Sequence, residues 1–152
     1  MNKDKLLADI KQAEGFRDVA YKDTNGFWTG GYGHLLYPQY RDWTGEKFDQ
    51  DTIQSWLSSD IDRACGLAQG TVEWPSLDCD ARQNAVVELV YNMGIGTWKL
   101  FALTRAALTH KQWQMAYDGL LNSKWAHEVQ PDGFDKPGRA TRIATYILTG
   151  AF

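Results

Sequence analysis

Two carboxylates and a hydroxyl group lie close together near the start of the chain, at Glu14, Asp23 and Thr29. Two carboxylates held in unlike surroundings can divide acid and base work between them, one donating a proton and the other staying ionised. A hydroxyl group beside them could hold a water molecule. The same residues are also ordinary in a helix end and a hairpin turn, so the elements that position them decide between the two interpretations.

Glu14 follows a short segment with the spacing of an amphipathic helix. Its apolar residues recur at helical intervals over residues 3–13, and Gly15 is a typical residue to end the helix. A carboxylate at that end meets unpaired carbonyl groups, which disfavour its negative charge. Burial beside aromatic side chains would act in the same direction. The sequence therefore predicts that Glu14 can hold a proton and donate it.

Residues 16–36 read as strands around an Asp-Thr-Asn-Gly turn. A two-residue Asn-Gly loop would place Asp23 and Thr29 on opposite faces of the hairpin, because strand side chains alternate. A three-residue loop with Gly26 in the left-handed conformation would pair Asp23 with Phe27 and put Asp23 and Thr29 on one face. We favour the second loop, because it uses Asp and Gly where each is preferred.

The rest of the chain predicts an α+β protein with a β-hairpin sheet in a small N-terminal lobe. A helix of residues 50–69, capped by Asp49 or Asp51, would connect it to a larger all-helical C-terminal lobe. We expect one domain over residues 1–152. Its lobes would cover about residues 1–60 and 70–152.

Apolar stripes at helical spacing run through the C-terminal half. One helix is predicted to start near Thr97, and another carries Trp113. The last helix should open with Pro137 in its first turn, because proline is favoured there.

Composition narrows the function. The 152 residues carry a net charge of −3, which gives no basic footprint for nucleic acid, and 13% of them are aromatic, a residue type that stacks on sugar rings. Cys65 and Cys79 lack the spacing of a metal site, so we favour two free thiols over a disulfide. The first residues contain no apolar run of signal-peptide length, and we expect no signal peptide.

Residues 14–36, EGFRDVAYKDTNGFWTGGYGHLL, resemble the active-site region of the phage lysozymes, the endolysin muramidases. That family's pattern is Glu, eight residues, Asp, five residues and Thr, which Glu14, Asp23 and Thr29 match without a gap. Later segments also resemble the family in the right order: VELVYNMGIGTW, Ser123-Lys124-Trp125 and PGRATR. The resemblance covers nearly the whole chain and implies a lysozyme-like α+β fold.

The resemblance implies hydrolysis of the β-1,4 bond between N-acetylmuramic acid and N-acetylglucosamine in peptidoglycan. Glu14 resembles the acid that protonates the glycosidic oxygen, and Asp23 resembles the carboxylate that assists the attack of water. Thr29 resembles the residue that orients this water. Family members are considered inverting, a reaction that needs about 6.5–9.5 Å between the carboxyl groups to admit the water.

Supporting residues follow from the same resemblance. Arg139 resembles a family arginine that approaches the catalytic glutamate, here Glu14. His34 and Asp60 match a family pair that we interpret as a structural ion pair between the hairpin and the following helix.

Three further residues match positions that line the family's sugar cleft: Leu35, Tyr91 and Thr104. The chain departs from the family in having Gly119 where a cleft asparagine is expected and Ala13 where some members have an acid. These departures concern substrate contacts rather than the reaction.

The resemblance implies an endolysin that acts in host lysis on peptidoglycan glycan strands, without a cofactor or metal. We expect a monomer with no nucleic-acid partner and no stable membrane association. It would stay in the host cytoplasm until a membrane-hole protein lets it reach the peptidoglycan in the periplasm.

Two other functions are compatible with parts of the sequence. A lytic transglycosylase can work with one glutamate, but it has no need of Asp23 and Thr29. A non-catalytic peptidoglycan-binding module has no need of an acid at the end of a helix.

Overall fold

The computed structural model describes residues 1–129 and 137–152, and these fall into two compact units. The N-terminal unit is Leu7–Arg63, and the C-terminal unit combines Met1–Leu6 with Ala64–Phe152. The prediction that they form one domain stays a prediction.

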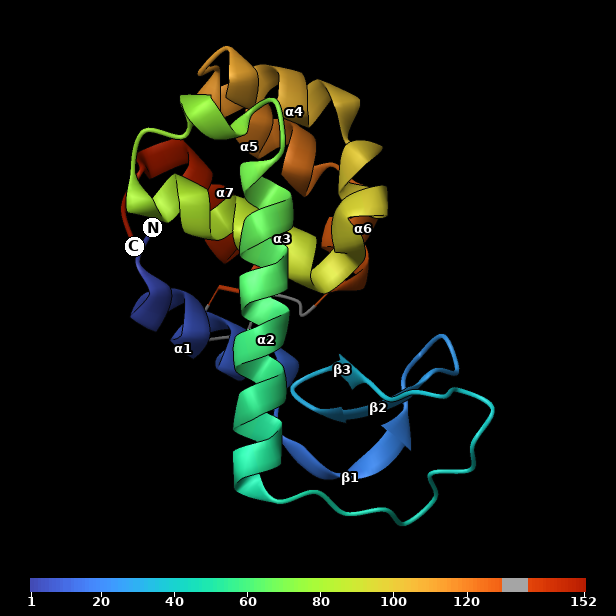
Figure 1. Cartoon of the computed structure of the whole chain (residues 1–152). Helices are drawn as coiled ribbons and strands as arrows, with labels where there is room; N and C mark the ends of the chain where they lie inside the picture. Colours follow the sequence, from blue (N-terminus) through green and yellow to red (C-terminus); the bar gives the residue numbers. More distant parts are fainter. Residues whose placement is uncertain (130–136) are drawn as a thin grey trace. The chain divides into compact units, whose positions relative to one another are not determined.

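The N-terminal unit contains a three-stranded antiparallel sheet in the order β1-β2-β3, drawn as neighbouring arrows in Figure 1. Two helices flank it in sequence, and each has residues in both units. The bounds are α1 (Lys3–Glu14), β1 (Arg17–Lys22), β2 (Trp28–Gly31), β3 (His34–Leu35) and α2 (Gln50–Gln69).

The turn between β1 and β2 is the three-residue loop that the sequence favours. The N–H of Asp23 donates to the carbonyl oxygen of Phe27 at 2.9 Å, and Gly26 adopts a φ of 82°. Tyr21 is paired with Thr29 across the two strands. Because side chains alternate along a strand, Asp23, Tyr21 and Thr29 share one face of the hairpin.

The other face of the sheet carries the small aromatic core of this unit. Buried Ala20, Leu36 and Trp43 pack with three partly buried rings, those of Trp28, Phe48 and Trp56. Gly30 lies against this core, where a β-carbon would come within 3.1 Å of Phe48 and 3.3 Å of Trp56. A side chain at this position would therefore push the rings away from the sheet.

The long helix α2 has the predicted bounds, and Asp49 is its cap. The Oδ1 atom of Asp49 accepts a hydrogen bond from the backbone N–H of Thr52 at 2.7 Å. This bond lowers the pKa of Asp49, because it stabilises the charged form. Of the two candidate caps, Asp49 therefore makes the bond and Asp51 lies in the first turn of the helix.

The C-terminal unit is helical throughout its described elements. In it α5 packs against α4 and α7, and α3 packs against α7. The bounds are η1 (Trp74–Ser76), α3 (Asp80–Lys99), α4 (Ala102–Thr109), α5 (Trp113–Leu121), α6 (Lys124–Glu128) and α7 (Arg139–Thr149). Together with the sheet, these helices confirm the predicted α+β class.

The helix predicted to start near Thr97 is divided in the structure. A new helical stretch follows the break at Gly94 (φ 78°, ψ 153°) and ends at Lys99, and α4 begins at Ala102. The predicted start of the last helix is wrong. Pro137 does not lie in the first turn of α7. Gly138, with an extended backbone (ψ 173°), is its N-cap, so the helix starts at Arg139, two residues beyond Pro137.

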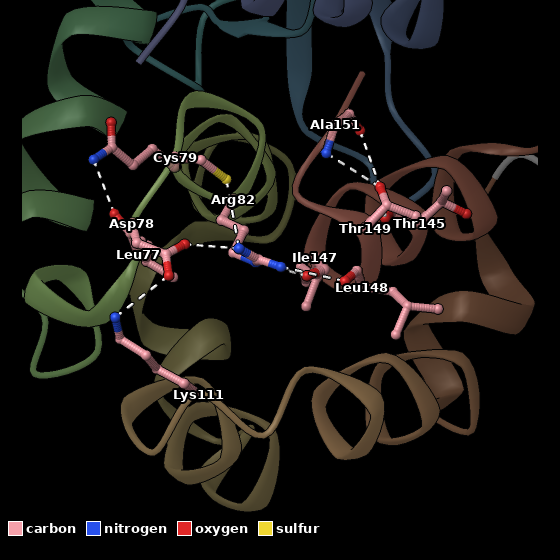
Figure 2. A network of polar contacts seen from close by, with 11 residues as sticks. Leu77, Asp78, Cys79, Arg82, Lys111, Thr145, Ile147, Leu148, Thr149 and Ala151 are labelled. Carbon is pink, nitrogen blue, oxygen red and sulfur yellow. Dashed lines mark hydrogen bonds and ion pairs between the residues drawn. The ribbon is translucent and has the colours of Figure 1, made fainter.

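Arg82 joins the start of α3 to the end of α7, as Figure 2 shows. Its guanidinium donates to the carbonyl oxygens of Ile147 at 2.9 Å and Leu148 at 3.2 Å. These groups lack partners within the last turn of a helix, and a cation is favoured beside them. Asp78 holds Arg82 in place at 2.7 Å, and this bond is the main cause of the lowered pKa of Asp78.

Cys65 is buried and Cys79 is partly buried, and no disulfide joins them in the described structure, in line with the favoured interpretation. The Sγ atom of Cys79 lies 3.7 Å from Nη1 of Arg82 (Figure 2). Among the described residues, no helix combines the length and the apolar character needed to cross a membrane.

Candidate active site

Glu14 is the last residue of α1, and its carboxylate lies against a glycine of the sheet. The helix ends because Gly15 adopts a φ of 69°, a conformation that favours glycine. Gly33 has a φ of 86°, and a β-carbon there would lie 3.4 Å from Oε2 of Glu14. The short turn between β2 and β3 thus brings backbone close to the carboxylate of Glu14.

Asp23 is oriented by its own turn. Its Oδ1 atom accepts hydrogen bonds from the backbone N–H groups of Asn25 and Phe27, both at 2.9 Å. The side chain is partly exposed. Because the turn uses Oδ1, the second oxygen, Oδ2, is the one that the turn leaves for chemistry.

Thr29 is a buried hydroxyl with a fixed direction. Only 2% of the residue is exposed, and its Oγ1 donates to the carbonyl oxygen of Phe27 at 2.9 Å. Because the hydroxyl hydrogen is used in this bond, Oγ1 meets any further partner as an acceptor. A water molecule could therefore donate to Thr29 on the face that Thr29 shares with Asp23.

Tyr21 belongs to the same face, although the sequence interpretation missed it. Burial raises the pKa of its hydroxyl; Arg17 opposes this shift, and the negative charges of Glu14 and Asp23 add to it. The guanidinium of Arg17 lies 4.4 Å from the centre of the Tyr21 ring. Its position two residues before Asp23 on one strand was the signal that could have found it.

The predicted pair of His34 and Asp60 is confirmed. The Nδ1 atom of His34 lies 2.7 Å from Oδ2 of Asp60, and Nη2 of Arg63 lies 3.0 Å from Oδ1. The His34 ring also stacks on Trp56, with 4.5 Å between ring centres. These contacts join β3 to α2 and support the interpretation of a structural pair.

Leu35 is brought next to the candidate catalytic residues. It is paired with Thr29 across β2 and β3, and 39% of it is exposed. It can therefore contact a molecule that lies over the sheet.

Tyr91 and Thr104 belong to the C-terminal unit, and their approach to a bound sugar stays a prediction. Tyr91 is partly buried on α3 and Thr104 is buried on α4. A β-carbon at Gly119 would lie 2.8 Å from Oγ1 of Thr104. The threonine hydroxyl therefore occupies the space that a side chain at position 119 would need, which fits a glycine at this position.

Arg139 is buried on α7, where its Nε donates to Oε1 of Glu88 at 3.0 Å. Arg142 binds the same carboxylate through Nη1 at 2.9 Å and Nη2 at 2.8 Å. The sequence interpretation missed Glu88 as a partner of Arg139. The predicted approach of Arg139 to Glu14 stays a prediction.

The chain thus has a glutamate at a helix end, a three-stranded sheet with an aspartate and a threonine on one face, a long helix and a helical unit. These features define a lysozyme-like α+β protein. The sequence pattern of phage lysozyme matches residues 11–141, and the chain belongs to the phage lysozyme family.

Several proteins of known name are similar to this chain. "Probable T4-type lysozyme 1" of Dictyostelium discoideum is 24% identical over 93% of the chain and 92% of its own length. "Peptidoglycan hydrolase gp36" of Pseudomonas phage phiKMV is 26% identical over 77% of the chain, which spans only 13% of that protein. An "Endolysin" of Acyrthosiphon pisum secondary endosymbiont phage 1 is 30% identical over 60% of the chain and 59% of its own length.

Proposed function

We propose that the protein is a peptidoglycan-degrading lysozyme that hydrolyses the β-1,4 bond between N-acetylmuramic acid and N-acetylglucosamine. Membership of the phage lysozyme family supports this proposal, as do the names of relatives that are a peptidoglycan hydrolase and an endolysin. The main observation in favour of the proposal is that Asp23 and Thr29 lie on one face of the hairpin. Hydrogen bonds hold both side chains in fixed directions there.

In this proposal Glu14 donates its proton to the glycosidic oxygen as the bond from that oxygen to the anomeric carbon breaks. A water molecule attacks the anomeric carbon from the opposite side, and Oδ2 of Asp23 accepts the proton that the water loses. Oγ1 of Thr29 accepts the second hydrogen of the water, since its own hydrogen is donated to Phe27. Attack from the opposite side inverts the configuration of the sugar.

The other predicted site residues have supporting parts in this reaction. His34 and Asp60 hold the sheet against α2, so they keep β3 and its Leu35 in place. Leu35, Tyr91 and Thr104 would contact the sugars, and Arg139 would approach Glu14 from α7. In the cell we expect a monomer that acts in host lysis after a membrane-hole protein opens a path to the peptidoglycan.

Mass spectrometry of the fragments released from purified peptidoglycan tests the proposal. Fragments with reducing N-acetylmuramic acid ends are expected from hydrolysis of the proposed bond. Ring-closed ends, which are lighter by one water molecule, would show a lytic transglycosylase and remove the part assigned to Asp23. Binding without any fragments, by a protein shown to be folded, would leave only a binding module.

Proton NMR of the fresh fragments tests the stereochemistry separately. Inversion of a β bond predicts that the α anomer of the new reducing end appears first and then equilibrates. Initial appearance of the β anomer would contradict the inverting mechanism while leaving the hydrolysis itself intact.

A further inference from the structure

A hollow lies on the N-terminal unit, on the face of the hairpin opposite to Asp23 and Thr29. Lys22 and Trp28 are paired across β1 and β2, one position along from the Tyr21–Thr29 pair, so they point to the other side of the sheet. The hollow has a volume of about 470 Å³. Its walls are Lys22, Trp28, Gln39, Tyr40, Arg41, Asp42 and Thr44.

The loop of residues 37–48, which forms most of these walls, is fixed to the sheet by Gln39. The side-chain oxygen of Gln39 accepts from the N–H of Trp28 at 2.7 Å. Its nitrogen donates to the carbonyl oxygens of Trp28 at 3.0 Å and Leu36 at 2.6 Å. The amide of Gln39 thus bonds to the sheet as the backbone of an added strand would.

The far end of the loop is fastened to the outer edge of β1. The N–H of Ala20 donates to the carbonyl oxygen of Glu46 at 2.9 Å, and the N–H of Phe48 donates to that of Asp18 at 2.8 Å. Between the two ends, the indole of Trp43 donates to the carbonyl oxygen of Pro38 at 3.1 Å. A loop held at three places loses little further conformational entropy when a ligand binds.

This fixed loop presents Tyr40 to solvent. Tyr40 is 93% exposed and lines the hollow, and the ring of Trp28 lines it as well. Aromatic rings offer flat apolar faces, and the C–H faces of pyranose rings stack on such surfaces. Tyr37 in the same loop is 70% exposed but is not one of the lining residues, which makes it a natural comparison.

The charges around the hollow balance. Arg41 pairs with Glu46, and the cation of Lys22 is opposed by Asp42. The hydroxyl and N–H of Thr44 lower the pKa of Asp42, with a smaller contribution from Lys22, so Asp42 is ionised at neutral pH. A site for phosphate or nucleic acid would need a surplus of positive charge, whereas this one suits an uncharged ligand rich in hydroxyl groups.

We propose that this hollow is a second saccharide site, which binds an uncharged amino-sugar unit of a glycan chain away from Asp23 and Thr29. The saccharide class follows from the aromatic and polar walls. The choice of an amino sugar rests on the proposed function. Such a site would hold a glycan strand to the protein without taking part in its cleavage.

A titration of the full chain with the tetramer of N-acetylglucosamine, followed by two-dimensional NMR, tests the proposal. The Glu14→Gln variant is used so that the tetramer is not cleaved. We expect the amide signals of residues 39–44 and the indole signal of Trp28 to move with one common affinity. In Tyr40→Ala, loss of the stacked ring should weaken that affinity about five- to tenfold.

Matched variants separate the ring from the rest of the loop. Tyr40→Phe keeps the ring and should bind as before, and Tyr37→Ala should change nothing at these signals. If signals 39–44 stay in place, or if Tyr40→Ala binds unchanged, the proposal is wrong. If the same signals move when inorganic phosphate is added in place of the tetramer, the proposal is also wrong, because the site would then prefer anions.

The outcome is independent of the proposed cleavage. If the protein does not cleave peptidoglycan, the signals of residues 39–44 can still move when the tetramer is added. Cleavage with no response at those signals would overturn the second site alone.

Discussion

Carboxylates in the two units are held in different ways. In the C-terminal unit, Glu73 is fully buried and accepts hydrogen bonds from Arg105 at 3.0 Å and from the indole of Trp98 at 2.7 Å. In the same unit Glu88 is 1% exposed and binds two arginines. In the N-terminal unit, Asp23 is partly exposed and is held by backbone N–H groups of its own turn.

This difference in surroundings indicates two roles for a carboxylate, one in stability and one in chemistry. A buried carboxylate with arginine partners balances their charge inside the protein, and removal of one partner leaves an uncompensated charge in the interior. An acid of this kind serves the stability of the fold. An acid that is oriented by backbone groups keeps an oxygen for a substrate or a water molecule, which suits chemistry.

Glu88→Gln should show the largest effect on the fold. The substitution removes the charge that Arg139 and Arg142 both bind, and breaking a buried ion pair costs about 3–5 kcal/mol of unfolding free energy. Urea denaturation measures this loss. As a control, Glu128→Gln removes an exposed acid paired with Lys124 at 3.4 Å and should cost less than about 1 kcal/mol.

Equal losses of unfolding free energy in Glu88→Gln and Glu128→Gln would contradict the comparison. A buried carboxylate with arginine partners would then contribute no more to stability than an exposed one. A loss confined to Glu88→Gln would sharpen the comparison.

Asp23→Asn tests the other side of the comparison. The amide oxygen of asparagine can accept the same two turn bonds, so the unfolding free energy should change little. The base is lost, and the rate of peptidoglycan cleavage should fall by about 100-fold or more. A variant that cleaves at the normal rate would show that Asp23 serves the turn alone.

Asp60→Asn lies between these extremes. Asp60 is 9% exposed and bonds to His34 and Arg63, so loss of its charge should cost about 1–3 kcal/mol of unfolding free energy near neutral pH. The cleavage rate per folded molecule should be retained. Lost cleavage by a folded variant would place Asp60 in the chemistry instead.

The smallest effect is expected at Asp49, the exposed cap of α2. Its pKa is lowered in the folded state, so its contribution to stability is present above the usual aspartate pKa and is lost as the pH falls through the folded-state value. Asp49→Asn keeps a capping oxygen but removes this dependence. Melting temperatures from about pH 6 to about pH 2 should fall less steeply in Asp49→Asn than in the wild type.

Local sequence predicted much of the site. Gly15 marks the end of α1, and the Asp-Thr-Asn-Gly turn fixes the register that puts Asp23 and Thr29 on one face. These features depend on the backbone preferences of a few adjacent residues, so the sequence contains them directly. The pair of His34 and Asp60 was found only through the family resemblance.

Features that depend on distant residues were missed. Glu88 and its partner Arg139 are 51 positions apart, and the bond forms only when α3 and α7 pack together. The position of Glu88 within the apolar stripe of α3 was the available signal, but nothing in the sequence indicated which residue would pair with it. The bonds of Gln39 to the sheet were equally hidden, because an amide side chain that replaces a strand has no sequence pattern.

We propose that Glu14 donates the proton in the cleavage reaction and is not needed for the fold. The most direct test measures, for Glu14→Gln, both the rate of peptidoglycan cleavage and the unfolding free energy in urea. We predict that cleavage falls by about 100- to 10,000-fold while the unfolding free energy changes by less than about 1 kcal/mol. Cleavage within tenfold of the wild-type rate, or a loss that only follows unfolding, would contradict the claim.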